Sequence, residues 1–331
     1  MTDLASSDRL TEEQMAAVAS NSLIKKRLEE RIETAVLSET PPFPRTVLVE
    51  VSNICNHRCV FCAYPKMTRP RNVIDPGLFR DVMRQAYELG AREAGLYAGA
   101  EPLTCKHLDE YIAYLSDLGY DYIYISTNGT LADEARFKRL IDAGLHSIKF
   151  SVNGGDRETY AKIHGKDEFD KVINNIRFVN QYRRTIGRPL YLAVSFVEVP
   201  ENAPSFAALE RLVGPLVDEI VHFPAVNQNG QMLNLPVDPA IPDTCVLPFN
   251  QVHISREGYI RACCNDYQNL LATEDLNKVS LKDAWFGERF RELRRRHLEK
   301  DLKGALCHNC LTGCRDKVRP INPELGDWGT I

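Results

Sequence analysis

The stretch VLVEVSNICNHRCVFC, residues 47–62, determines the fold and the chemistry expected of this chain. It begins with a mainly apolar run that predicts a buried strand over residues 47–51. Three cysteines follow at Cys55, Cys59 and Cys62. Intervals of three and two residues let one loop fold around a compact inorganic cluster with three thiolates. One iron of a 4Fe-4S cube then has no protein ligand, and this open iron is a place for chemistry.

A zinc knuckle is the alternative explanation of this cysteine spacing. Structural zinc sites close with four ligands, and no fourth cysteine or histidine lies at a standard zinc interval. His57 lies inside the loop, and we interpret it as a loop residue. The three-cysteine cluster is therefore the preferred interpretation.

The pattern CxxxCxxC after a first strand, with Phe61 just before the last cysteine, resembles the radical S-adenosylmethionine (radical SAM) superfamily. The resemblance implies that Cys55, Cys59 and Cys62 hold a 4Fe-4S cluster whose open iron chelates the amino and carboxylate groups of SAM. It also implies that the reduced cluster cleaves SAM to a 5′-deoxyadenosyl radical. Phe61 is then a candidate SAM contact.

The overall composition is that of an ordinary globular protein. The chain has 331 residues, of which 44% are apolar and 26% charged, enough for one large α/β unit and a smaller one. Lys plus Arg number 41 against 45 Asp plus Glu, a net charge of −4. This balance gives no global electrostatic reason to bind nucleic acid and favours a small polar substrate.

The N-terminal sequence MTDLASSDRLTEE has neither a basic segment nor an apolar segment of a secretory signal. No run approaches the roughly 18 consecutive apolar residues of a membrane span. We therefore expect a cytoplasmic protein with no membrane partner. The cytosol keeps thiols reduced, so metal binding explains the ten cysteines better than a disulfide framework does.

Hydrophobic periodicity predicts that strands and helices alternate about six times from Thr46 onward. The predicted strands are 47–51, 93–97, 122–126, 147–152, 190–197 and 219–223. The predicted helices between them are 76–89, 106–118, 133–143, 169–180 and 205–213. Asp75 is the predicted N-cap of the first of these helices, and Gly119 is predicted to end the second. Six such units imply a parallel sheet with right-handed crossovers, either open and doubly wound or curved into a partial barrel. The family resemblance implies an α/β fold of the second kind, a partial (β/α)6 TIM-like barrel with cluster and SAM at the C-terminal ends of its strands.

The chain is predicted to have three parts. Residues 1–43 form an N-terminal helical extension, with a capping box at Thr11 and a helix to about Leu37. Residues 44–235 form the barrel, and residues 236–331 form a small α+β cluster-binding domain. In the last part, one long polar helix over 281–299, capped by Ser280, is expected to expose its arginines to solvent.

A second cysteine group lies in the C-terminal part, with the spacing C-x17-C-x43-C-x2-C. Four thiolates close a metal site completely, and spacing alone leaves zinc and an iron-sulfur cluster as alternatives. The pattern resembles the SPASM/twitch region, and the resemblance implies one auxiliary 4Fe-4S cluster. Its candidate ligands are Cys245, Cys263, Cys307 and Cys310. Cys314 is an alternative ligand for one of them, and Cys105 is interpreted as a buried residue.

Short polar groups follow several of the predicted strands and are candidates for SAM binding. Gly99-Ala100-Glu101-Pro102 resembles the GGEP motif of the family, which implies that the Glu101 carboxylate accepts hydrogen bonds from the SAM ammonium. Asn128 follows the third strand, and Ser151 and Asn153 follow the fourth. Family members use such residues for the SAM carboxylate and ribose. A turn-forming Asn-Gly pair is the alternative explanation of both asparagines.

These patterns together predict a radical SAM oxidoreductase with two 4Fe-4S clusters. The resemblance to twitch-type dehydrogenases implies a small carbohydrate-like or aminocyclitol substrate, whose secondary alcohol is oxidised by way of the auxiliary cluster. An electron donor such as flavodoxin or ferredoxin is the expected partner. An epimerase is an alternative in which Cys264 returns a hydrogen atom to the substrate radical. A peptide-modifying maturase and a non-catalytic zinc-binding regulator are two further alternatives.

Overall fold

The computed structural model describes residues 22–232, 234–237 and 244–325. The chain divides into two compact units, residues 1–35 and 36–331. The described helix of the first unit is α2, Leu23–Glu33, and the Ser22 hydroxyl caps it by accepting from the Lys25 N–H. This helix ends before the predicted boundary at Leu37, because the Thr34 hydroxyl donates to the Glu30 carbonyl and closes its last turn. The predicted capping box at Thr11 lies outside the described residues.

In the second unit, nine strands of the described chain form one mostly parallel sheet in the order β6-β5-β4-β3-β2-β1-β7-β8-β9. The six predicted strands are confirmed, with ends that differ by one or two residues. The partial barrel is made of β1 (Thr46–Val49), β2 (Glu93–Gly95), β3 (Tyr122–Thr127), β4 (Ser147–Ser151), β5 (Tyr191–Glu198) and β6 (Glu219–Pro224). Neighbouring strands in this part are all parallel, as expected for βα units.

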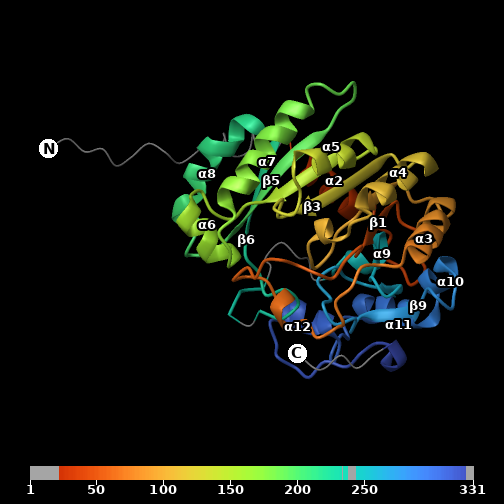
Figure 1. The fold of residues 1–331 in the computed structure, drawn as a ribbon. Coiled ribbons are helices and arrows are strands. Elements are labelled where there is room, and N and C mark those ends of the chain that lie inside the picture. Colours follow the sequence, from red (N-terminus) through yellow and green to blue (C-terminus); the bar gives the residue numbers. More distant parts are fainter. Residues whose placement is uncertain (1–21, 233, 238–243, 326–331) are drawn as a thin grey trace. The chain divides into compact units, whose positions relative to one another are not determined.

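Helices cover the barrel strands, and side chains from both layers form the hydrophobic core. Figure 1 shows α4, α5 and α7 side by side along the strands, and α4 packs on α5 and α5 on α7. The predicted N-cap Asp75 accepts from the Leu78 N–H, and Gly119 ends α4 in the left-handed conformation. The helices of the barrel are α3 (Pro76–Glu88), α4 (Leu108–Leu118), α5 (Glu134–Asp142), α6 (Arg157–His164), α7 (Phe169–Tyr182) and α8 (Phe206–Val213). Every helix in the described ranges is too short or too polar to cross a bilayer.

The C-terminal strands extend the barrel sheet. β7 (Gln251–Ile254) pairs with β1 in parallel, and β8 (Tyr259–Arg261) and β9 (Ala272–Asp275) add an antiparallel hairpin. Strand β1 therefore has β2 on one side and β7 on the other. The cysteine loop that follows β1 thus lies next to the point where the barrel strands and the C-terminal strands β7 to β9 join in one sheet.

The prediction of one continuous helix over 281–299 is wrong, and so is the predicted exposure of Arg294, whereas the side chains of Arg289, Arg291 and Arg295 are 40 to 42% exposed. Gly287 interrupts it, so that α10 (Leu281–Trp285) and α11 (Glu288–Leu298) are separate helices. The break lets the rings of Trp285 and Phe290 pack edge to face at 5.0 Å. Arg294 is fully buried against both rings and donates to the Pro248 and Trp285 carbonyls, which a solvated face does not allow. Two further short helices, α9 (Leu247–Asn250) and α12 (Leu306–Thr312), complete this part.

Candidate active site

The three clustered cysteines lie on a loop that hydrogen bonds hold at both ends. At its base, Asn53 donates to the Pro70 carbonyl at 3.0 Å and accepts from the Asn72 N–H at 2.7 Å. Further along, the N–H groups of Arg58 and Val60 donate to carbonyls at the end of α6. The Cys62 N–H donates to the Cys59 carbonyl at 3.0 Å. The loop is thus a fixed turn around the sulfur atoms.

The surroundings of the three sulfur atoms suit thiolates bound to a metal cluster. Burial raises the pKa of Cys55 to about 12, and burial and the charges of Cys62 and Cys55 raise the pKa of Cys59 well above its ordinary value. Three neighbouring thiolates therefore require a positive group between them. Backbone N–H groups of His57 and Tyr64 also point at the sulfurs of Cys55 and Cys62, at 3.5 and 3.4 Å. These residues fit a 4Fe-4S cluster with three protein ligands.

A buried pair of histidines lies behind Cys59. The Asn153 N–H donates to His164 Nε2 at 3.1 Å, so neutral His164 carries its proton on Nδ1. That Nδ1 faces Cys59 Sγ at 3.6 Å and His57 Nδ1 at 3.2 Å. His57 Nε2 lies 2.9 Å from the Glu168 carboxylate, to which it donates. Burial lowers the pKa of both histidines, which form a buried hydrogen-bonded pair between the Cys59 sulfur and the Glu168 carboxylate.

Glu101 lies at the C-terminal end of the strands, close to the cysteine loop. Its carboxylate accepts hydrogen bonds from the Leu103 N–H, the Thr127 hydroxyl and the Asn128 N–H. Burial raises the pKa of Glu101 to about 7 despite these bonds. Glu101 also raises the pKa of Cys55 by its charge. The residue therefore ties β2 to β3 next to the cysteines, and Oε2 has one remaining acceptor position.

The two candidate asparagines brace the site with their side chains. Asn128 donates to Asn56 Oδ1, within the cysteine loop, at 2.8 Å and accepts twice from Thr130. The Asn153 amide contacts His164 Nε2 at 3.2 Å, and its oxygen accepts from the Val197 N–H at 2.7 Å. Most polar atoms of these two side chains are therefore engaged within the protein. Their direct contact with SAM stays a prediction.

Ser151 and Phe61, the other two candidate SAM contacts, have different surroundings from the two asparagines. Ser151 ends β4 and is half-buried, with its hydroxyl 3.5 Å from that of Ser195 on β5. Phe61 packs among Ile163, Val199 and Ala225, so its ring forms part of an apolar patch beside Cys59 and Cys62. Both side chains lie near the end of the strands where the cysteine loop is located.

The second cysteine group is assembled from three separate segments. Cys307 and Cys310 lie one turn apart on α12, Cys245 precedes α9, and Cys263 follows β8. Burial and the charges of Cys245, Cys263 and Cys310 raise the pKa of Cys307. Donors point at Cys263 Sγ from Asn229 Nδ2 at 3.5 Å and from the Asn265 N–H at 3.4 Å. The four residues fit a closed cluster with four thiolate ligands.

The remaining cysteines have different positions. Cys264 shares a hydrogen bond with Cys263, which lowers the pKa of Cys264 and raises that of Cys263. Cys314 is exposed, beyond the end of α12. Cys105 is fully buried in the core, and the prediction that it is a buried residue is confirmed.

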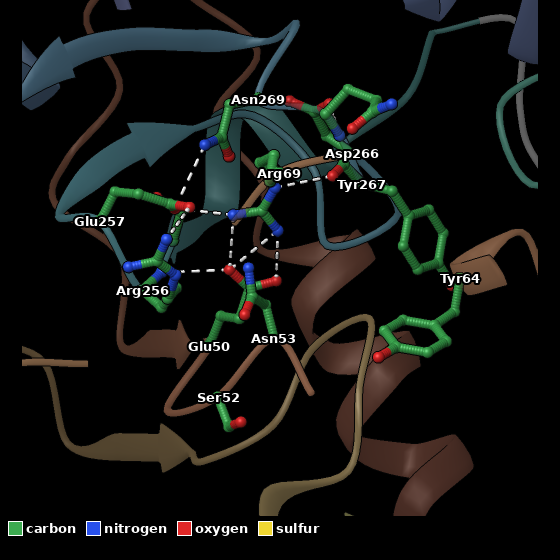
Figure 2. A network of polar contacts seen from close by, with 12 residues as sticks. Glu50, Ser52, Asn53, Tyr64, Arg69, Arg256, Glu257, Asp266, Tyr267 and Asn269 are labelled. Atoms are coloured by element: carbon green, nitrogen blue, oxygen red, sulfur yellow. Dashed lines mark hydrogen bonds and ion pairs between the residues drawn. The ribbon is translucent and has the colours of Figure 1, made fainter. Parts of the chain in front are cut away.

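Figure 2 shows a buried polar network around Arg69, which lies beyond the first cysteine loop and contacts residues on both sides of it in the chain. Arg69 lies between the carboxylate of Glu50, the residue directly after β1, and the carbonyl of Tyr267, four positions beyond Cys263. Tyr267 in turn places its hydroxyl 3.5 Å from Cys62 Sγ. Sequence analysis identified none of these three residues, nor His164. No spacing motif marks them, because their partners lie far away along the chain.

Two family models match this chain. The Radical SAM superfamily model matches residues 49–193, and SPASM, an iron-sulfur cluster-binding domain, matches residues 245–311. The first range contains the three-cysteine loop and Glu101, and the second contains the four-cysteine group.

Curated relatives and solved structures are also similar to the chain. The S-adenosyl-L-methionine-dependent 2-deoxy-scyllo-inosamine dehydrogenase of Niallia circulans is 23% identical over 79% of this chain and 90% of the relative. The PqqA peptide cyclase of Xanthomonas campestris is 30% identical over 56% of this chain and 48% of the relative. The first curated relatives, at 31% identity, are matched over only 46% and 41% of their own length. A crystal structure of BtrN in complex with AdoMet and 2-DOIA shares the fold, with a TM-score of 0.55 at 18% identity over 87% of this chain and 98% of that one.

Proposed function

We infer that this chain, which belongs to the radical SAM superfamily and carries a C-terminal SPASM domain, oxidises a secondary alcohol on a small carbohydrate-like or aminocyclitol substrate. Its cofactors are SAM and 4Fe-4S clusters. The observation that carries the proposal is that two family models match this chain, one over the three-cysteine loop and the other, an iron-sulfur cluster-binding domain, over the four-cysteine group. Oxidation of an unactivated alcohol needs both an agent that abstracts hydrogen and a site that accepts an electron.

The three-cysteine centre is the proposed place of hydrogen abstraction. Cys55, Cys59 and Cys62 hold a 4Fe-4S cluster, and with SAM bound this centre supplies a radical that abstracts hydrogen. Glu101 Oε2 accepts from the SAM ammonium with its remaining lone pair. Phe61 provides an apolar contact for SAM, and Ser151 a hydroxyl at the end of β4. Asn128 and Asn153 bind SAM at the same C-terminal end of the strands. Their side chains also contact the cysteine loop and His164, respectively.

The four-cysteine centre is the proposed electron acceptor. Loss of a hydrogen atom from the carbinol carbon and of a proton from its hydroxyl leaves one electron on the substrate. Cys245, Cys263, Cys307 and Cys310 would hold a 4Fe-4S cluster that could accept this electron, while the proton is released to water. Four protein ligands leave this cluster no open position, which suits electron transfer better than substrate chelation. The substrate is thereby converted to a ketone.

The similarity to the 2-deoxy-scyllo-inosamine dehydrogenase supports the proposed substrate class, because the match spans most of both chains. A one-electron donor such as flavodoxin or ferredoxin is the proposed partner, and the reducing cytoplasm is the proposed location. The match to a PqqA peptide cyclase favours a second candidate function, modification of a peptide.

The first experiment measures 5′-deoxyadenosine after anaerobic cluster reconstitution with SAM and a strong reductant. We expect product from the natural chain and none from the Cys55→Ala, Cys59→Ala, Cys62→Ala variant, because only three-cysteine ligation leaves the open iron. A reconstituted chain that forms no product, even with candidate sugars, aminocyclitols and peptides present, would overturn the proposal.

Product analysis separates the candidate functions. A ketone formed from an aminocyclitol or sugar alcohol supports the dehydrogenase. An isomer that carries solvent deuterium supports the epimerase, in which Cys264 donates the returning hydrogen atom. A cross-linked or shortened peptide supports the maturase.

A further inference from the structure

Tyr267 belongs to the C-terminal part of the chain but lies at the three-cysteine centre of the barrel. Its side chain is 5% exposed, and its hydroxyl lies 3.5 Å from Cys62 Sγ. Its ring covers Gly99 so closely that a Cβ at that position would lie 2.5 Å from a ring carbon. The ring also packs with Tyr64 and Met67, which lie in the segment after Cys62. The phenol therefore occupies a defined position beside one proposed cluster ligand.

The backbone of Tyr267 is held by a buried arginine. Arg69 Nε donates to the Tyr267 carbonyl at 2.7 Å, and the Arg69 guanidinium forms a two-pronged ion pair with Glu50 at 2.8 to 3.0 Å. Figure 2 shows Arg69 between Glu50 and the Tyr267 carbonyl. Arg69 and Glu50 are both at most 2% exposed, so water does not loosen the pair. The residue directly after β1 and the loop after β8 are thereby fixed to each other through Arg69.

The loop that carries Tyr267 is also rigid by itself. The Asp266 carboxylate accepts from three backbone N–H groups, those of Gln268, Leu270 and Leu271. The Gln268 side chain accepts from the Thr68 N–H at 3.1 Å, next to Arg69. The residues on either side of Tyr267 are therefore anchored, which keeps the phenol against Cys62.

A thiolate ligand can only accept a hydrogen bond, so the Tyr267 hydroxyl donates to Cys62 Sγ when a cluster is bound. Such a bond withdraws electron density from the sulfur and stabilises the reduced, more negative cluster. We propose that Tyr267 is a positioning residue through which the C-terminal domain raises the reduction potential of the SAM-binding cluster. The inference rests on the proposed ligation of that cluster by Cys55, Cys59 and Cys62.

The test is a redox titration of the reconstituted full-length protein, followed by electron paramagnetic resonance. The SAM-binding cluster is identified by the change that SAM causes in its signal, and the auxiliary cluster serves as an internal reference. We expect Tyr267→Phe to lower the equilibrium constant for reduction of the SAM-responsive cluster about tenfold, a shift of about 59 mV to more negative potential. The potential of the auxiliary cluster is expected to stay unchanged.

Tyr120→Phe is the matched control. Tyr120 is a buried tyrosine that donates to the Met83 carbonyl at 2.8 Å, so this variant also loses one buried phenol hydrogen bond. Because its partner is a carbonyl on α3, neither cluster potential is expected to move. A ring-fluorinated tyrosine at position 267 keeps the shape and donates a stronger hydrogen bond, so the potential is expected to rise.

The results distinguish this inference from the proposed function. A natural chain that shows no SAM-responsive cluster would refute the proposed function itself. A natural chain with that cluster, and variants at position 267 whose SAM-responsive potential equals the natural one, would refute the role of Tyr267 alone. If Tyr267→Phe does not retain its clusters, the fluorinated tyrosine decides by the presence or absence of the positive shift.

Discussion

The two cysteine centres of this protein are built in opposite ways. Cys55, Cys59 and Cys62 lie within eight positions on one loop, which is held by one local backbone bond, from Cys62 to Cys59, and by two bonds to the end of α6. The other centre draws on a segment before α9, the end of β8 and the helix α12. The first centre therefore takes all its proposed ligands from one loop, whereas the second has its ligands together only when the C-terminal part is folded.

The two centres are less independent than their ligands suggest, because one buried network joins the residues beside them. Glu50 and Arg69 flank the first cysteine loop, and Arg261 and Tyr267 flank Cys263 of the second group. Buried ion pairs and hydrogen bonds join these residues across the strands β1, β7 and β8. The first centre is thus local in its ligands but depends on the C-terminal part for its surroundings.

The largest expected effect separates the chemical roles of the centres. We expect Cys59→Ala to reduce SAM cleavage to background, a loss greater than the about 100-fold cost of removing an outer-shell partner. Cys307→Ala is expected to keep measurable SAM cleavage but to lose oxidation of the alcohol. Iron content, 5′-deoxyadenosine and ketone are measured on both variants. Equal loss of SAM cleavage in both would show that the two centres do not act separately.

The next effect tests the network that joins the centres. Glu50→Gln removes the ion-pair partner of buried Arg261 and one of the two carboxylates that pair with buried Arg69, the other being Glu257. Because a buried charge then loses its compensation, we expect the free energy of unfolding to fall by about 3–5 kcal/mol. Urea unfolding followed by circular dichroism measures this change. Glu88→Gln is the matched control, since Glu88 pairs with Arg84 on the exposed face of α3. A Glu50 variant as stable as this control would mean that the network does not hold the two parts together.

The pH dependence of the free energy of unfolding is expected to show a smaller effect, which also comes from the Glu50 carboxylate. Burial alone raises the pKa of Glu50, but Arg261 and Arg69 outweigh it and lower the pKa from 4.5 to about 2. The unfolded chain therefore binds this proton at higher pH than the native chain. A shift of this size corresponds to about 3 kcal/mol, present above pH 4.5 and lost as the pH falls toward 2.

This loss is measured by urea unfolding of metal-free protein at several values of pH. Glu50→Gln cannot titrate at this position, so its stability is expected to fall by about 3 kcal/mol less over the same range. Parallel curves for the two proteins would contradict the assignment of the shift to Glu50.

The smallest expected effect concerns Cys264, which lies beside a proposed ligand of the second centre. A dehydrogenase does not return hydrogen to its substrate, so we expect Cys264→Ala to change the rate of ketone formation by less than about twofold. The rate is measured with the substrate found in the product analysis. Complete loss of turnover, with both clusters retained, would instead favour the epimerase.

The sequence predicted the elements whose signals are local. Alternating strand and helix patterns identified the six barrel strands, and Asp75 and Gly119 marked helix ends that the structure confirms. The continuous helix over 281–299 was wrong, because periodicity did not register that a break at Gly287 lets Trp285 and Phe290 meet. Arg294 was placed on a solvated face for the same reason, since a charged residue gives no local sign of its distant carbonyl partners.

The sequence alone determined the chemistry that this protein is built around, because three cysteines at fixed intervals on one loop need no distant partner to form a ligand set. Only the tertiary structure decided what surrounds those sulfurs. His164 reaches Cys59 from the end of α6, and Tyr267 reaches Cys62 from beyond β8. Hydrogen bonds and ion pairs act over a few ångströms in space and leave no periodic trace along the chain. Residues that surround a centre from far away in sequence therefore become visible only when the chain is folded.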